Sequence, residues 1–339
     1  MVHRSFSAGG QVISKGMKFF LASAYANPVP DYGPRWLIQH AASGVECLVT
    51  DPGEADVIIF VERYQAGDPF YRSVLRSPVF QRWPSKCLLY HTADHALVPC
   101  RTITPSNERR QWGAASRQTF HYVARIQENE ALASFEWSKA KPTKLYSFQG
   151  ACSTHPVRSR LFEGAHPDAL LIDTSDKTHH TTTGHDRDAY EKAYVAMIAD
   201  SRFVLCPRGL GPCTYRLFEV MQMGRVPVII SDDWIPMADV PWHLFSIQIR
   251  ESDVKRIPEI LEGRKREAEE MGMKARQAWE EFCSPEVSLR HLLTVAHNLS
   301  RQDYTLMNKC VEVPNLFIQP FNRMVLKKLR DLMCGRGVW

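Results

Sequence analysis

The residues from 201 to 233 constrain the fold of this chain more than any other stretch. An apolar run at 203–206 precedes the loop Pro-Arg-Gly-Leu-Gly-Pro, a helical segment at 215–223, Gly224 and a second apolar run at 226–230. Neither run alternates polar with apolar residues, which is typical of parallel strands covered on both faces. The loop's prolines and glycines interrupt regular structure, and glycine commonly stands just after a helix. The segment predicts one tight right-handed βαβ unit.

In such a unit a ligand lies at the carboxyl ends of the strands, beside the helix N-terminus, where free N–H groups favour phosphate. Thr214 is placed to be the N-cap of the helix. Arg208 in the loop and Arg216 in the first helical turn can both donate to a diphosphate. Glu219, one turn after Arg216, can accept from two ribose hydroxyls. The alternative is an exposed Arg216–Glu219 ion pair worth under about 1 kcal/mol; the glycine-rich loop favours the ligand.

The same stretch resembles the C-terminal signature of exostosin-like glycosyltransferases, which reads C-P-R-G, a variable loop, R-L-x-E, a glycine and P-V-I-I-S-D. The matching residues are Cys206-Pro207-Arg208-Gly209, Arg216-Leu217-Phe218-Glu219, Gly224 and Pro227-Val228-Ile229-Ile230-Ser231-Asp232. The chain departs from the pattern at Tyr215, where members often have Ser, and it has no clear W-N-R-x-x-G-x-D-H-F block. Weaker matches are residues 51–60, similar to an element of the family's first half, and residues 146–150 followed by Arg158 and Arg160, similar to the start of its nucleotide-binding half.

The resemblance spans roughly residues 17–300. It implies an α/β fold of the GT-B type, with two doubly wound Rossmann-like domains facing a cleft. It also implies a nucleotide-sugar donor, commonly UDP-linked, inversion at the anomeric carbon and no obligatory metal or other cofactor. The acceptor would be a hydroxyl of a glycan, polysaccharide or glycolipid. The residues then expected to hold the donor are Arg158, Arg208, Gly209, Gly211, Thr214, Arg216, Glu219 and Asp232.

An inverting transfer needs a base for the attacking hydroxyl and positive charge opposite the leaving diphosphate. In GT-B enzymes the base usually comes from the first domain, after a strand that faces the cleft. Glu62, directly after the run at 57–61, and Asp94, just after the run at 87–91, fit this placement, with His91 and His95 nearby. Each carboxylate could equally cap a helix or turn. A noncatalytic nucleotide- or glycan-binding relative without the base is the alternative function.

Alternating apolar runs and helical patches predict the domain organisation. After a flexible extension at 1–16, the first domain covers 17–140, with strands at 18–22, 57–61 and 87–90 and helices at 34–44 and 71–83, the latter interrupted by Pro78. A lysine-rich linker at 139–144 leads to the second domain at 145–300. Its other expected elements are strands at 145–148, 170–172 and 245–249 and helices at 157–162, 190–199 and 252–282. The last helix is expected to break at Gly263 or Gly272.

The tail at 301–339 contains a basic amphipathic segment at 321–332, expected to form a helix that crosses back to the first domain. Its basic face is interpreted as solvated, with peripheral membrane contact as the alternative. No apolar stretch approaches the roughly 18–20 residues that span a bilayer. Residues 17–26 superficially resemble a signal peptide, but this stretch is interpreted as containing the first strand, at 18–22.

Composition supports a globular enzyme without specifying it. A length of 339 residues suits two domains. The net charge of +5 is compatible with a phosphate-bearing donor, and no basic-aromatic pattern of RNA binding occurs. Nine cysteines without a C-x-x-C pair argue against a disulfide framework or zinc site and favour a reducing cytoplasm. The oligomeric state is left open.

Three further motifs resemble metal or dinucleotide sites, but each is interpreted differently. Ser231-Asp232-Asp233 resembles metal-binding carboxylates but is interpreted as a loop cap near the donor sugar. The three histidines His179, His180 and His185 have metal-compatible spacing, but their Thr/Gly-rich surroundings indicate a flexible loop that could contact the acceptor. Gly209-x-Gly211 lacks the third glycine and the later acidic residue of a dinucleotide site, so an NAD enzyme is disfavoured.

Overall fold

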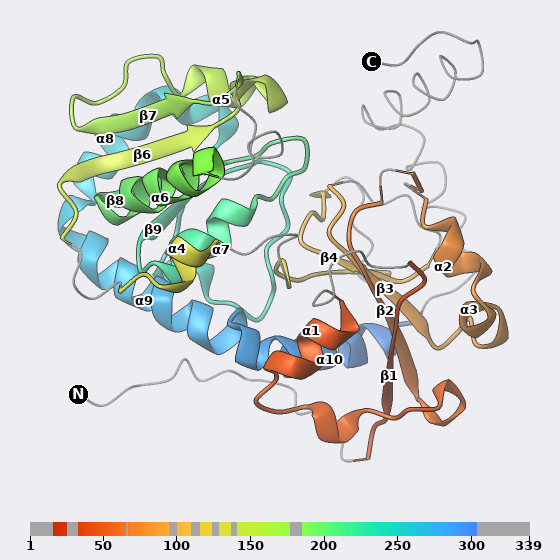
Figure 1. The fold of residues 1–339 in the computed structure, drawn as a ribbon. Coiled ribbons are helices and arrows are strands. Elements are labelled where there is room, and N and C mark those ends of the chain that lie inside the picture. Colours follow the sequence, from red (N-terminus) through yellow and green to blue (C-terminus); the bar gives the residue numbers. More distant parts are fainter. Residues whose placement is uncertain are drawn as a thin grey trace, which may run out of the picture.

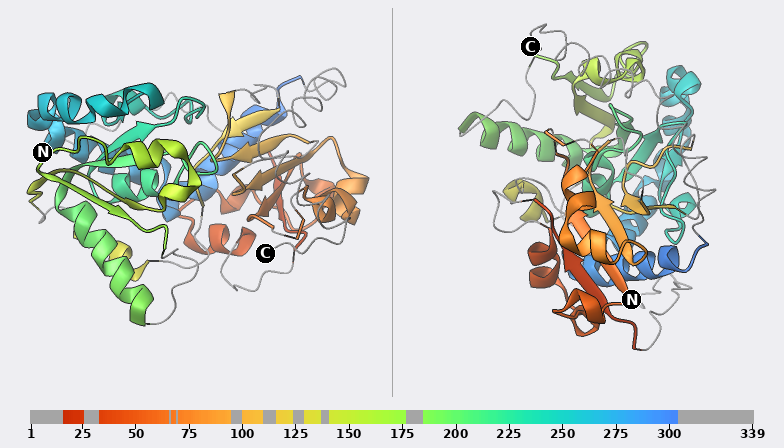
Figure 2. Two further views of the ribbon diagram at one scale, coloured as in Figure 1. Left: turned by 90° about the horizontal axis from the view of Figure 1, so that it is seen from above. Right: turned by 90° about the vertical axis from the view of Figure 1, so that its right-hand side faces the viewer.

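The computed structural model describes residues 16–25, 33–65, 67–68, 70–94, 100–109, 116–123, 129–136, 141–176 and 185–303. These residues form two five-stranded parallel sheets, each within its own α/β unit (Figure 1). The first unit contains strands β1–β5 and the second contains strands β6–β10. Two further views show the units side by side (Figure 2).

The first sheet keeps its strands in sequence order, β1-β2-β3-β4-β5, all parallel. Its strands are β1 (Phe19–Ala22), β2 (Val57–Glu62), β3 (Cys87–His91), β4 (Thr102–Thr104) and β5 (Arg117–Thr119). Strands β2 and β3 are buried throughout, as their unbroken apolar runs predicted. The 3-10 turns η1 (Val45–Cys47) and η2 (Pro52–Glu54) lie between β1 and β2.

Helices cover both faces of this sheet. One face carries Val57, Ile59 and Val61 and packs with residues of α1 (Pro34–His40) and α10 (Pro285–Ser300). The other face carries Ile58 and Phe60 and packs with residues of α2 (Arg72–Arg76) and α3 (Pro78–Arg82). The last two helices meet at Ser77, whose hydroxyl accepts from Phe80 N, so the predicted interruption at Pro78 is confirmed.

The second sheet has the order β10-β9-β8-β6-β7 and is also parallel. Its strands are β6 (Lys144–Gly150), β7 (Ala169–Asp173), β8 (Ser201–Pro207), β9 (Val226–Ile230) and β10 (Ile247–Gln248). The chain moves from β6 to β7 on one side and then returns to β8 on the other side of β6. This doubly wound order has its switch point between β6 and β8, where a ligand is expected beyond the carboxyl ends of the strands.

The remaining helices pack around the second sheet or connect the two units. They are α4 (Glu130–Ala133), η5 (Cys152–Thr154), α5 (Pro156–Arg160), α6 (His185–Ala199), α7 (Tyr215–Gln222), η6 (Trp242–Leu244), η7 (Glu251–Arg256), α8 (Ile257–Gly263), η8 (Lys265–Glu267) and α9 (Ala268–Phe282). The βαβ unit predicted from 201–233 is thus β8–α7–β9. Gly224 follows α7 with φ 62°, as expected for a helix stop.

Helix α10 leaves the second unit and packs against the first. It contacts α1, β2 and β5 and lies beside α1 in Figure 1. The helix crossing back in this fold is therefore α10, whereas the segment at 321–332, expected in that role, lies outside the described residues.

The expected break in the helical segment at 252–282 is confirmed at the first of its two candidate positions. The break occurs at Gly263, where α8 ends, and α9 runs unbroken through Gly272. A Cβ atom on Gly272 would lie 2.4 Å from Gly224 O, so glycine allows α9 to pack directly on the end of α7. Gly272 serves close packing rather than helix termination.

No helix among the described residues is long and apolar enough to cross a membrane.

Candidate active site between the two units

Arg158 joins the carboxyl ends of β6 and β8 at the switch point. Its Nε donates to Arg208 O at 2.8 Å, and its Nη1 and Nη2 donate to Ala151 O and Pro207 O at 3.0 and 3.4 Å. Burial, followed by the charge of Arg216, lowers the pKa of Arg158 to about 10, so the guanidinium remains charged at neutral pH. The predicted donor-binding arginine therefore lies where the sheet order places a ligand.

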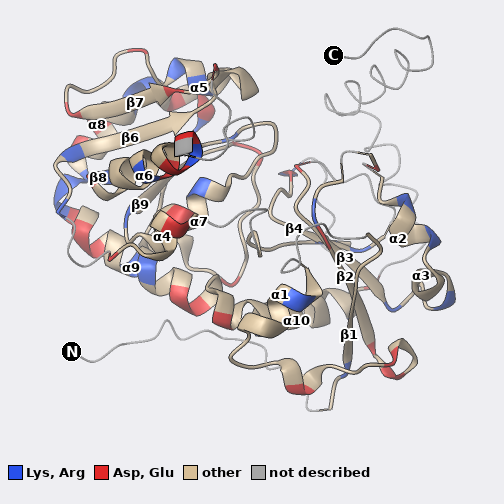
Figure 3. Cartoon of the chain, viewed as in Figure 1, with Lys and Arg blue, Asp and Glu red and all other residues tan. Residues whose placement is uncertain are grey.

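Arg216 lies at the same edge, in the first turn of α7. It is 8% exposed, it donates from Nη2 to Gln149 O, and its guanidinium lies 4.8 Å from the ring centroid of Phe148. Among the residues that the structure describes, its buried Nε and Nη1 have no hydrogen-bond partner. Unsatisfied donors on a buried cation are costly, so the site is suited to an anion that would accept from them. Figure 3 marks the basic positions on α5 and near the start of α7.

Glycines let these cations approach the backbone closely. A Cβ on Gly209 would lie 2.9 Å from Arg158 Nη2, and one on Gly150 would lie 3.0 Å from Arg216 Nη2. Gly150 at the end of β6 and Gly209 in the loop therefore leave space for these guanidinium groups.

Asp94 brings a carboxylate of the first unit to the loop of the second. A Cβ on Gly211 would lie 2.4 Å from Asp94 Oδ1, which also accepts from Ser106 Oγ at 3.5 Å. Burial raises the pKa of Asp94 to about 6, opposed by the Ser106 hydroxyl and by the charges of Arg158 and Arg208. A carboxylate with a pKa close to neutrality suits proton transfer.

Glu62, the other predicted base, fastens the end of β1. Its Oε1 accepts from Ala24 N at 2.6 Å and its Oε2 accepts from Ser23 Oγ at 3.0 Å. The side chain is 2% exposed, and burial raises its pKa to about 7. These hydrogen bonds stay within the first unit, so the structure brings Asp94, rather than Glu62, to the predicted donor loop.

Of the two histidines that neighbour the candidate base Asp94 in the sequence, His91 lies among the described residues and His95 does not. His91 Nδ1 accepts from Ala93 N at 3.1 Å, and burial lowers the pKa of His91 to about 3, so this side chain is neutral at physiological pH. His95, His179 and His180 lie outside the described residues, and His185 is the first residue of α6.

Arg208 takes part in the joint between the units. Its guanidinium lies 3.6 Å from Glu108 of the first unit and 3.1 and 3.8 Å from Asp233 and Glu251 of the second. Nearby, Trp234 Nε1 donates to Pro105 O at 3.0 Å. The guanidinium of Arg208, which was predicted to bind a diphosphate, is therefore paired with carboxylates in this structure.

The other predicted donor residues have varied surroundings. Glu219 is 5% exposed and accepts from Tyr194 OH at 2.5 Å. Thr214 occupies the N-cap position of α7 without a side-chain capping bond. Asp232 Oδ1 accepts from Glu251 N, and Asp232 N donates to Glu251 Oε1, both at 3.1 Å. This reciprocal pair matches the loop-cap interpretation of the Ser-Asp-Asp motif.

Two residues near Asp94, Ser106 and Tyr122, were not predicted from the sequence. Ser106 donates to Asp94, while Tyr122 stacks on Tyr215 with ring centroids 3.7 Å apart. The departure from the family serine at Tyr215 was the one available signal. Within the described ranges no group of three or more His, Cys, Asp or Glu side chains could hold a metal ion.

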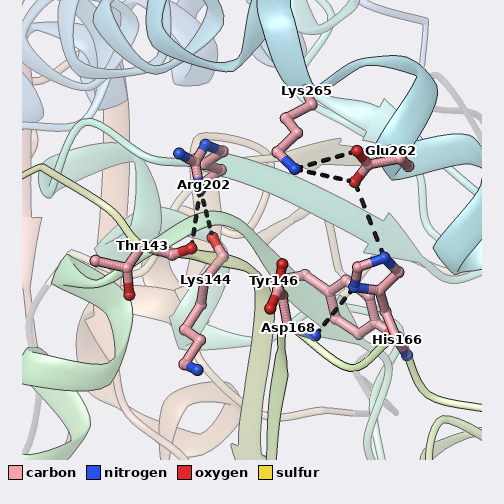
Figure 4. A network of polar contacts seen from close by, with 8 residues as sticks. All are labelled: Thr143, Lys144, Tyr146, His166, Asp168, Arg202, Glu262 and Lys265. Atoms are coloured by element: carbon pink, nitrogen blue, oxygen red, sulfur yellow. Dashed lines mark hydrogen bonds and ion pairs between the residues drawn. The ribbon is translucent and has the colours of Figure 1, made fainter.

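Hydrogen bonds and ion pairs connect residues at the amino-terminal edge of the second sheet (Figure 4). Arg202 donates to the carbonyls of Thr143 and Lys144 at 3.1 and 3.3 Å. Glu262 of α8 pairs with Lys265 at 3.1 Å and lies 4.0 Å from His166 Nε2. These contacts satisfy backbone and side-chain groups at this edge.

Comparison with known proteins agrees with this geometry. Residues 35–263 match the family model of the exostosin GT47 domain. An exostosin-1 homolog of Caenorhabditis elegans is 34% identical over 115 residues, which are 32% of this chain and 30% of that protein. A probable beta-1,4-xylosyltransferase of Arabidopsis thaliana is 38% identical over 82 residues, 24% of this chain and 19% of that protein. The chain thus matches less than a third of the length of either relative.

A glycosyltransferase structure from Rickettsia africae ESF-5 aligns with 86% of this chain and 100% of its own, at a TM-score of 0.41 and 9% identity. The two parallel-sheet units, the switch point and the returning helix α10 are those of a GT-B fold. Since the family model spans more than half of the residues, the chain belongs to the exostosin GT47 family of glycosyltransferases.

Proposed function

We propose that this chain is an inverting glycosyltransferase that moves a sugar from a nucleotide-sugar, UDP-linked, to a hydroxyl of a glycan, polysaccharide or glycolipid. Membership of the family supports the reaction class. The observation that carries the proposal is the contact between Asp94 of the first unit and Gly211 of the second, beside Arg158. It supports the proposal because Asp94, the proposed base, then lies near the guanidinium of Arg158, which we propose as a diphosphate-binding group.

In the proposed reaction the donor diphosphate lies at the β6/β8 switch point against Arg158 and Arg216. Asp94 accepts the proton of the acceptor hydroxyl, whose oxygen attacks the anomeric carbon from the face opposite the diphosphate. The bond from that carbon to the diphosphate oxygen breaks, and the electron pair leaves with the nucleoside diphosphate. The two guanidinium groups stabilise the charge that develops there. Attack opposite the leaving group inverts the anomeric configuration.

Asp94 is a better candidate base than Glu62 for a geometric reason. Both oxygens of Glu62 already accept hydrogen bonds from the end of β1. Asp94 lies against the loop that carries Arg208 and adjoins Arg158, so a reacting hydroxyl placed beside it would also be near the donor. A base must be within hydrogen-bond reach of the proton that it removes.

A panel of UDP-, GDP- and CDP-sugars, each with and without glycan acceptors, tests the function. The proposal expects one class of UDP-sugar to give acceptor-dependent release of UDP, with a product of inverted configuration. The reaction should persist in excess EDTA, because guanidinium groups supply the positive charge. A rise of the melting temperature with UDP and no turnover of any donor would instead support a noncatalytic nucleotide-binding relative.

We also place the protein in a reducing compartment, the cytoplasm. The described cysteines Cys47, Cys87, Cys100, Cys152, Cys206, Cys213 and Cys283 are all free thiols. Most are buried, where they pack as small apolar residues. Fractionation of cells that express the tagged full chain tests this placement, and a lumenal or secreted pool would contradict it.

A further inference from the structure

Tyr122 and Tyr215 form a stacked pair across the junction. Tyr122 follows β5 of the first unit, and Tyr215 begins α7 of the second. Their ring centroids are 3.7 Å apart with an interplanar angle of 26°, and Tyr122 also meets the edge of Phe218. Serine, the residue that exostosin-like proteins often have in place of Tyr215, could not form this stack.

The hydroxyl of Tyr122 begins a chain that ends on Asp94. Tyr122 OH lies 3.3 Å from Ser106 Oγ, which lies 3.5 Å from Asp94 Oδ1. Ser106 has one hydroxyl proton and donates it to the carboxylate, so Tyr122 must donate to Ser106. Burial raises the pKa of Tyr122 well above its ordinary value, which keeps that proton in place. Such bonds are often long before substrate binds.

We propose that Ser106 and Tyr122 are positioning residues for Asp94, and that Tyr215 fixes Tyr122 so that the carboxylate is oriented when the two units are docked. The proposal deepens the function proposed above and rests on it. It assigns to the Tyr122–Tyr215 stack a role in the reaction, in addition to its contribution to packing. Chains of hydroxyls that end on a charge polarise one another and favour one orientation.

The charged and titratable groups around Asp94 define what a pH profile would report. Arg158 and Arg208 face it from the second unit and lower its pKa, while Tyr122 and Cys213 lie close enough to interact with it. None of these is altered when Ser106 loses its hydroxyl. A displacement of the acid limb in Ser106→Ala would therefore report loss of the donated hydrogen bond, which favours the ionised carboxylate.

The test measures transfer kinetics and UDP affinity for Ser106→Ala, Tyr122→Phe, Tyr215→Ser and Tyr215→Phe. Tyr146→Phe is the matched control, since its hydroxyl accepts from His166 N at the opposite edge of the second sheet. Ser106→Ala should lower kcat about tenfold and move the acid limb upward by about half a pH unit, with KM for the donor unchanged. Tyr122→Phe keeps the stack and should give the same changes at smaller size.

The Tyr215 variants separate the stack from the hydroxyl chain. Tyr215→Ser should lower kcat about tenfold, and Tyr215→Phe should restore most of that rate because it keeps the stack. UDP affinity and the control variant should match the wild type. If Tyr215→Ser fails to fold, Ser106→Ala and Tyr122→Phe decide the question.

Two outcomes distinguish this proposal from the function beneath it. If Asp94→Asn transferred sugar at the wild-type rate, both the proposal that Asp94 is the base and the proposal that Ser106 and Tyr122 position it would be wrong. Inactivity of Asp94→Asn, combined with wild-type kcat and acid limb in Ser106→Ala and Tyr122→Phe, would overturn the positioning role alone.

Discussion

Gly211 and Asp94 touch across the junction of two units that are far apart in sequence. A Cβ atom on Gly211 would lie 2.4 Å from the Oδ1 atom and 2.9 Å from the Cβ of Asp94. Because Gly211 has no side chain, the carboxylate of Asp94 can occupy the space beside it. A single methyl group is enough to disturb the proposed pairing of base and donor loop.

Replacing Gly211 with Ala should reduce transfer by about tenfold to a hundredfold, since a displacement of about 1 Å is costly at a reacting centre. UDP affinity should change much less, because the hydrogen bonds that hold Arg158 and Arg216 go to backbone carbonyls other than that of Gly211. Gly263→Ala is the control, because a Cβ atom there would have no neighbour within 4 Å among the described residues. Steady-state kinetics and UDP titration measure both, and equal activity of the two variants would contradict the steric role.

Transfer and stability should respond to pH in opposite directions through Asp94. Its pKa is raised from 3.8 to about 6, and the base is active only when ionised, so transfer should fall as the pH drops through about 6. A carboxyl group with a raised folded-state pKa contributes stability that is present below 3.8 and is lost as the pH rises through about 6. Pairs of rate and urea-unfolding measurements from pH 4 to 8 test this. Asp94→Asn should lose its part of the pH dependence of unfolding.

Two buried arginines should separate binding from stability. Arg225 donates to Ala199 O from both Nε and Nη2, at 3.2 and 2.7 Å, and from Nη1 to Gly224 O at 3.2 Å. Arg225→Met should therefore lower the free energy of unfolding by about 2–3 kcal/mol and leave UDP affinity unchanged.

Arg216→Met should have the reverse effect. Because two donor nitrogens of Arg216 have no acceptor within the described part of the chain, the substitution should change the free energy of unfolding by less than about 1 kcal/mol while weakening UDP binding at least about tenfold. Denaturant unfolding and calorimetric titration of both variants give the comparison. Unchanged UDP affinity in Arg216→Met would remove this arginine from the donor site.

Glu219→Ala should abolish detectable UDP binding if the carboxylate holds the ribose. It should also cost about 1–3 kcal/mol of stability, because Tyr194 OH loses its buried acceptor. Tyr194→Phe removes the same hydrogen bond and keeps the carboxylate, so it should reproduce the stability loss with UDP affinity largely retained. Wild-type affinity in Glu219→Ala would contradict the assignment to the ribose.

The sequence predicted local elements well where one physical rule dominates. Unbroken apolar runs predicted β2, β3 and β9 to within one residue, and they predicted the central part of β8. The glycine stop at Gly224 and the interruption at Pro78 were also found correctly. Strands β4 and β5 were missed because they are three residues long and their polar Thr102, Thr104 and Arg117 are buried by tertiary packing. Hydrophobic pattern contains no signal for such strands.

Relationships between the two units could not be obtained in the same way. Sequence placement gave Glu62 and Asp94 equal standing, since both follow buried strands of the first sheet. Only the docked units show that one carboxylate meets Gly211 while the other accepts from Ser23 and Ala24. Arg208 and Glu108 likewise pair although they are 100 positions apart in the sequence, and no local sequence pattern indicates such a contact.

The most direct measurement compares Asp94→Asn with Glu62→Gln in acceptor-dependent transfer and in UDP affinity. Asp94→Asn should lower kcat by about a hundredfold to ten-thousandfold with UDP affinity retained, whereas Glu62→Gln should keep most of the transfer rate. Wild-type transfer by Asp94→Asn, or a loss confined to Glu62→Gln, would contradict the account that Asp94 is the base brought to the donor loop.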